Sequence, residues 1–157
     1  QPARRANMLS ARLVHLIEDH AEELCRGLLD DLQSNPRTPA YHRLDREQLR
    51  HRLYDVYRNL GRWLADTTEE HIESVYSELG RKRHAEGIPV SEVVFALILA
   101  KYHLRDYIRT CGLMDSAVEL YQEQEFHRLV GRFFDRAVYH TVRGYEQEVK
   151  ARHKVAA

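Results

Sequence analysis

The sequence predicts an all-α, single-domain bundle of five principal helices with a long C-terminal helix, and three observations support this prediction. Apolar residues recur at every third or fourth position along most of the chain, which is the spacing of one helix face. Prolines stand only at positions 2, 36, 39 and 89, so long stretches contain no obligatory helix breaker. Neither a sustained alternation of apolar and polar residues nor an Asn-Gly or Asp-Gly turn indicates a strand.

Apolar stripes and end signals predict the first two helices. A stripe over residues 9–32 predicts the first helix, which must end before Asn35-Pro36 because the residue preceding a proline is pushed out of the helical region. Asp45 and Gln48 have the spacing of a capping box. The stripe over residues 49–64 then predicts the second helix.

The third and fourth helices are expected to meet at a glycine and a proline. Thr67 and Glu70 repeat the capping signature, so a third helix is expected over about residues 68–86. Gly87 is well placed as the left-handed residue that ends it. Either Pro89 or Ser91 starts the fourth helix, since proline fits the first turn and serine caps free amides.

The fourth helix is predicted to be the core helix. Residues 93–100 are apolar on every side, which only an element wrapped by its neighbours tolerates. Gly112 is expected to end this helix. Ser116 and Glu119 then cap the last helix, which is expected to reach about Ala151.

Size, charge and cysteine content limit the classes of function. The chain has 157 residues, and its 24 basic and 24 acidic side chains give no reason to expect nucleic acid or an anionic membrane as a partner. The longest apolar run, residues 93–100, is short of the roughly 20 residues of a membrane helix. Cys25 and Cys111 are too few for a disulfide framework, which favours a reducing cytoplasm.

The chain divides into three parts on this interpretation. We expect residues 1–9 to form a basic arm, residues 10–148 the helical sensor or input domain, and residues 149–157 the start of a linker. Gln1 in place of Met and the charged final stretch indicate a fragment of a longer protein whose output domain follows.

The sequence contains none of the compact motifs of catalysis. It has no glycine-rich phosphate loop, no H-E-x-x-H pair and no G-x-S-x-G turn. A nucleophile, a base and an orienting group cannot be matched by spacing either. We therefore expect a non-catalytic domain.

The ten histidines raise the question of a metal site. Metal sites of helical bundles use Glu-x-x-His pairs, and this spacing does not occur here. His15 and His20 precede a glutamate by three residues, which is the reverse order, while Glu123 and His127 suit an ion pair. No metal is expected.

Two further patterns have structural explanations. The basic cluster of residues 81–84 ends the third helix, where cations meet the negative end of the helix dipole, and this role outweighs an anion site. His103 is followed by Leu-Arg-Asp and lacks the small residue or proline that accompanies a phosphotransfer histidine.

Five side chains are the candidate ligand-binding residues: Tyr76, Tyr102, His103, Tyr139 and His140. Tyrosines can line a cavity with their polar tips pointing inward. His103 follows the buried run directly, so a neutral imidazole there could ligate haem iron or titrate near neutral pH. The alternative is a half-buried histidine with one hydrogen bond.

Four stretches together resemble a known family: LIEDHAEEL at 16–24, NPRTPAY at 35–41, GRKRHAEGIPVSEVV at 80–94 and FFDRAVYHTVRGY at 133–145. Over roughly residues 10–148 the chain is similar to the N-terminal input domain of RsbR- and RsbD-type RsbT co-antagonists, and a similar module precedes bacterial sensor histidine kinases. The resemblance implies a helical domain, globin-like and without haem in the co-antagonists. It also implies dimerisation and a signal that passes along the last helix to a C-terminal output module.

We therefore expect a non-catalytic sensory input domain of a bacterial signal-transduction protein, either a sensor histidine kinase or an RsbR-like regulator, that forms a homodimer. One alternative is a globin-like sensor that binds haem or another small molecule between the fourth and last helices through His103 or His140. A second alternative is a protein-docking module of a stressosome-like complex with no small ligand.

Overall fold

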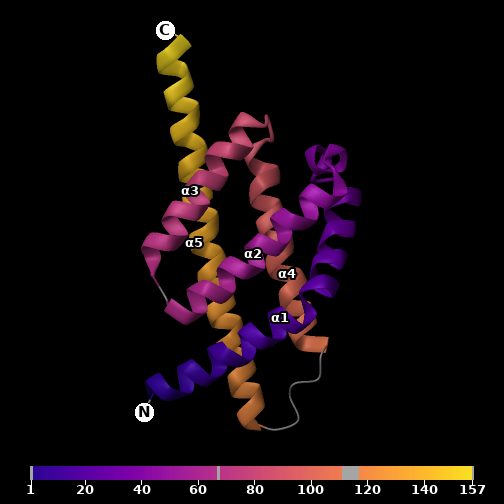
Figure 1. Ribbon diagram of the computed structural model, residues 1–157, viewed down its shortest axis with the longest axis vertical. Coiled ribbons are helices and arrows are strands. Elements are labelled where there is room, and N and C mark those ends of the chain that lie inside the picture. The colour runs from indigo at the N-terminus through magenta and orange to yellow at the C-terminus, as the bar shows by residue number, and fades with distance from the viewer. Residues whose placement is uncertain (1, 67, 111–116, 157) are drawn as a thin grey trace.

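The structure is a computed structural model that describes residues 2–66, 68–110 and 117–156 (Figure 1). Its helical elements are α1 (Pro2–Ser34), the short 3-10 helix η1 (Pro39–Arg43), α2 (Arg46–Asp66), α3 (Glu69–Ala85), α4 (Val90–Thr110) and α5 (Ala117–Ala156). The predicted all-α class with five principal helices is confirmed, and no strand occurs in the described ranges. The signals assigned to Thr67, Cys111, Gly112 and Ser116 lie outside them.

Local signals set the ends of α1 and α2. α1 ends at Ser34, directly before Asn35-Pro36, as the proline requires. The Asp45 carboxylate accepts a hydrogen bond from the Gln48 amide at 3.1 Å, which confirms the cap at the start of α2.

The connection between α3 and α4 is a Schellman motif. Gly87 has a positive φ of 74°, and its amide donates to the carbonyl oxygen of His84 at 3.0 Å. The Ile88 amide donates to the carbonyl oxygen of Arg83 at 3.1 Å. α4 then begins directly after Pro89, whose carbonyl oxygen accepts hydrogen bonds from the first turn. The predicted helix end at Gly87 is confirmed, and the proline is the start signal of α4.

Three boundaries differ from the expected ones. α1 begins at Pro2, within the predicted basic arm, and is kinked at His20, where φ is −122° and ψ is 15°. The expected loop contains η1, which forms because Tyr41 is buried against the core. α5 continues to Ala156, past the expected end, since its charged last turns contain no helix breaker.

The helices pack as a bundle around α5, which runs almost the full length of the molecule (Figure 1). α3 packs mainly on the C-terminal half of α5, and α4 lies between α5 and the second half of α1. α2 crosses the bundle obliquely and packs mainly on α1. Among the described residues, no helix combines the length and the apolar character that crossing a bilayer requires.

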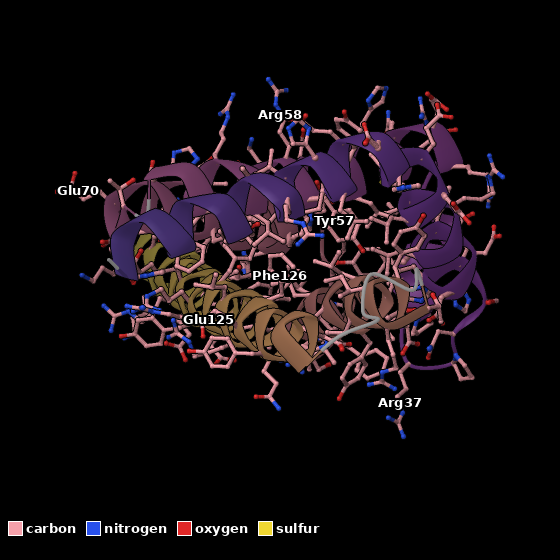
Figure 2. The ribbon with its side chains drawn as sticks, turned by 90° about the horizontal axis from the view of Figure 1, so that it is seen from below. Arg37, Tyr57, Arg58, Glu70, Glu125 and Phe126 are labelled. Carbon is pink, nitrogen blue, oxygen red and sulfur yellow. The ribbon has the colours of Figure 1, made fainter. Side chains whose placement is uncertain are left out.

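Aromatic side chains join the helices in the core. Phe133 of α5 contacts Trp63 of α2 and Tyr76 of α3, with ring centroids 5.8 Å apart in both pairs. Tyr57 and Phe126 point into the interior, as Figure 2 shows, and the Tyr57 hydroxyl donates to the carbonyl oxygen of Ala100 at 3.0 Å. These contacts connect α2 and α3 to α5, and α4 to α2.

Candidate functional site

α5 is the longest helix of the described residues. It has 40 residues, and at 1.5 Å per residue it is about 60 Å long. Its last described residues, 150–156, are all exposed, and this end projects beyond the other helices (Figure 1). The helix is thus held by the bundle along most of its length and free of it at the C-terminal end.

α3 and α5 are in direct backbone contact at two glycines. A Cβ atom on Gly80 would overlap the carbonyl oxygen of Thr141 and lie 2.7 Å from the Tyr145 amide nitrogen. A Cβ atom on Gly144 would meet the backbone of Ser77 in the same way. Only glycine allows the two helix backbones to approach this closely. A movement of α3 toward α5 would therefore bring backbone atoms of the two helices into direct overlap.

Polar contacts at both ends of α3 fix its position along α5. Near its start, the Glu69 carboxylate pairs with Arg136 and with His140 of α5. Just after its end, the Tyr145 hydroxyl donates to the carbonyl oxygen of Ile88 at 2.8 Å. Polar contacts thus join α3 to α5 at both ends of α3, in addition to the glycine contact between them.

The five sequence-predicted site residues do not share one cavity of the described structure. Tyr76 is 1% exposed and packs its ring against Phe133. Its buried hydroxyl has no hydrogen bond of ordinary geometry, although the Asn59 amide lies close enough to oppose the rise in its pKa that burial causes. Tyr76 is the one of the five that lines a described groove.

His103 and Tyr102 of α4 face different surroundings. His103 is half-buried and its Nε2–H donates to the Asp31 carboxylate of α1 at 2.8 Å. This is the geometry of a half-buried histidine with one hydrogen bond, and the imidazole faces α1. Tyr102 is 53% exposed and has Lys101 5.7 Å from its ring centroid.

Tyr139 and His140 of α5 differ in exposure, although their ring centroids are only 5.2 Å apart. Tyr139 is 58% exposed, whereas the His140 side chain is 12% exposed and lies beside Glu69, with 3.3 Å between Nε2 and Oε1. His103 and His140 thus each face a carboxylate of another helix. A ligand role for these five residues stays a prediction.

The described residues contain no group of three or more His, Cys, Asp or Glu side chains that could hold a metal ion. Glu123 and His127 lie on one face of α5 with 3.5 Å between Oε1 and Nε2, so the predicted pairing is confirmed.

Two grooves border the two faces of α2. The first, about 530 Å³, lies between α1 and α2 and is mainly apolar, with Ile17 and Tyr57 in its lining. The second, about 480 Å³, lies between α2 and α3 and is mainly polar, with Tyr76 in its lining. Both volumes fall within the range of small-molecule sites.

The comparison with known families decides what kind of domain this bundle is. The family described as the N-terminal domain of the RsbT co-antagonist protein RsbRD matches residues 18–156, nearly the whole chain. The chain belongs to this family. No curated protein and no solved structure matches it.

As an RsbRD N-terminal domain, this part of the protein is a non-catalytic regulatory domain. The match begins at residue 18 and so leaves out most of the first half of α1. It includes α3, α5 and the glycine contact between them.

Sequence reasoning missed the polar cluster at the C-terminal end of α3 in this RsbRD domain. Arg83 is 7% exposed, donates to the Glu86 carboxylate at 2.9 Å, and has its pKa lowered by burial and by neighbouring Arg52. Arg52 of α2 binds the same carboxylate through two hydrogen bonds, of 2.9 and 3.0 Å. The last-turn position of the basic residues is as predicted, but the burial of Arg83 depends on η1 and α4 and has no signal in the local pattern.

Proposed function

We propose that this RsbRD domain is the input domain of a bacterial stress-signalling protein, acts as a homodimer, and transmits a signal along α5 to a C-terminal output module. The output module would be a kinase core in a sensor kinase or a phosphorylatable regulator domain in an RsbR-like protein. The observation that carries the proposal is the backbone contact of α3 with α5 at Gly80 and Gly144. It supports transmission because a movement of α3 toward α5 would press directly on the α5 backbone, with no side chain between them to give way.

In the proposed dimer, apolar residues of α1 and α5 pair across a two-fold axis. Tyr121 and Tyr139 support the use of α5. They are 65% and 58% exposed, and their separation of eighteen residues is about five helical turns, which puts both rings on one side of the helix. Exposed aromatic side chains are enriched at protein interfaces.

Light scattering over a range of dilutions tests the dimer. We expect a mass near twice 18.5 kDa at micromolar concentration, and a shift toward the monomer for Tyr139→Glu. Tyr102→Glu is the matched control, because Tyr102 is equally exposed but lies on α4. A monomer at every concentration would refute the dimer.

A second candidate function is docking to other proteins of a stressosome-like assembly. Tyr102, Tyr121 and Tyr139 favour it, since each is more than half exposed and leaves a large aromatic surface in solvent. A pull-down with purified co-antagonist and scaffold proteins would test it. Equal capture by the wild type and by Tyr102→Ser with Tyr121→Ser would argue against these side chains as the docking surface.

A further inference from the structure

The groove between α2 and α3 has the form of a small-ligand site. The two helices follow each other directly in the chain, and near the far end of the pair Arg52 of α2 binds Glu86, one residue past α3, through two hydrogen bonds. The groove between them has a volume of about 480 Å³, which is enough for a ligand the size of a metabolite.

The lining of this groove has an excess of positive charge. Five cationic side chains and three carboxylates border it. Glu86 is already neutralised by Arg52 and Arg83, and Glu78 pairs with Arg81. Among the described residues, no carboxylate lies within ion-pair distance of Arg58, Arg62 or Lys82. In the same described part of the chain, no cation lies within that distance of Asp55. Three uncompensated cations therefore stand against one carboxylate.

The floor of the groove contains a buried hydroxyl without a partner. Tyr76 is 1% exposed, and its hydroxyl makes no hydrogen bond of ordinary geometry. Buried polar atoms in folded proteins nearly always have a hydrogen-bond partner. An unpaired hydroxyl in the floor of a groove therefore indicates a partner that is missing from the free protein and that a ligand could supply. Asn59, one of the other lining residues, adds an amide donor beside it.

We propose that this groove binds a small organic anion, with Arg58, Arg62 and Lys82 supplying the charge and Asn59 and Tyr76 donating hydrogen bonds. A carboxylate and a phosphate share this chemistry. Asp55 opposes binding and sets a limit on the charge that the groove accepts. The regulatory meaning rests on the proposed function: the bound anion spans α2 and α3, and α3 acts on α5 through Gly80.

The test uses the 157-residue chain and two probes, sodium phosphate and sodium citrate, at fixed ionic strength, because screening weakens the attraction of exposed charges. Amide chemical shifts are followed by NMR during each titration. We expect saturable shifts centred on residues 52–62 and 75–86 with at least one probe. The preferred probe then separates a phosphate ligand from a carboxylate ligand. Shifts that grow linearly with both probes would overturn the proposal.

Charge variants give effects of opposite sign. Arg62→Gln combined with Lys82→Gln should weaken binding about tenfold or more, because it removes two of the three uncompensated cations that border the groove. Asp55→Asn should tighten binding several-fold. Arg132→Gln, an exposed α5 arginine outside the groove, is the control and should bind like the wild type. Weaker binding in Asp55→Asn, or unchanged binding in the double variant, would refute an anion site.

Tyr76→Phe tests the hydroxyl itself. It keeps the ring packing against Phe133 and removes an atom that has no partner in the free protein, so the thermal midpoint should not fall. Binding of the preferred probe should weaken about three- to tenfold. A lower thermal midpoint with unchanged affinity would show that the hydroxyl is structural. These measurements do not depend on dimerisation. The proposal of an anion site can therefore be refuted while the proposed transmitter role of α5 is unaffected.

Discussion

Replacing Gly80 with alanine is expected to force α3 away from α5. The new Cβ atom would overlap the Thr141 carbonyl oxygen and approach the Tyr145 amide nitrogen to 2.7 Å, closer than any ordinary carbon contact. These neighbours are backbone atoms of a packed helix, so no side chain can rotate away. Overpacking of this kind costs about 3 kcal/mol, and the better helix propensity of alanine recovers about 1 kcal/mol, which leaves a net loss of about 2 kcal/mol.

Gly61→Ala provides the matched control. Gly61 also lies inside a helix, but the nearest atom to its added Cβ would be the Val14 Cγ2 at 4.0 Å, which is an ordinary contact. This variant should therefore be more stable than the wild type, by up to about 1 kcal/mol. The same chemical change thus has opposite signs at the two positions.

Urea unfolding followed by circular dichroism measures both changes in the free energy of unfolding. The double variant with Gly144→Ala should lose less than the sum of the single losses, because helices already separated by one methyl group admit the second. A Gly80→Ala variant as stable as Gly61→Ala would refute the backbone contact and, with it, the main support for transmission through α5.

Three further predictions concern titratable groups. Burial raises the pKa of Asp31, but hydrogen bonds, chiefly from His103, outweigh burial and hold it below its ordinary value. The stabilisation is therefore present above about pH 4 and lost as the pH falls further, so the free energy of unfolding should decline less steeply below pH 4 in Asp31→Asn than in the wild type. Burial raises the pKa of the Cys25 thiol to about 11, so alkylation of Cys25 at pH 8, followed by mass spectrometry of its peptide, should be far slower than in the urea-unfolded chain; equal rates would contradict its burial. Haem titration should give no stable Soret band, because in both His103 and His140 the Nε2 atom is held by a carboxylate of another helix. A band that His103→Ala abolishes would support the haem-sensor alternative.

Helix type and several helix ends could be predicted from the sequence because they depend on local chemistry. The apolar stripes, the cap at Asp45 and the left-handed residue Gly87 act within a few residues, and each has the predicted role. The start of α1 was misplaced because its first turns carry a weak apolar stripe, and helical propensity alone does not mark where an exposed helix begins.

The contacts on which the proposals depend could not be predicted, because they join distant segments of the chain. Gly80 and Gly144 are two of seven scattered glycines, and nothing in their spacing says that they meet. The pairing of His103 with Asp31 spans 72 positions of the chain. The α2–α3 groove depends on the angle between two helices, which is set by their separate contacts with α1 and α5.

The contact at Gly144 also amplifies small movements of α5 at its exposed C-terminal end. From this fulcrum the helix extends by twelve residues to Ala156, a reach of about 18 Å. A ten-degree bend of α5 at Gly144 would swing its tip by about 3 Å, while the part of the helix that packs in the bundle would keep its position. A rearrangement too small to disturb the core could therefore move the C-terminal tip of α5 by a distance comparable to the width of a methyl group.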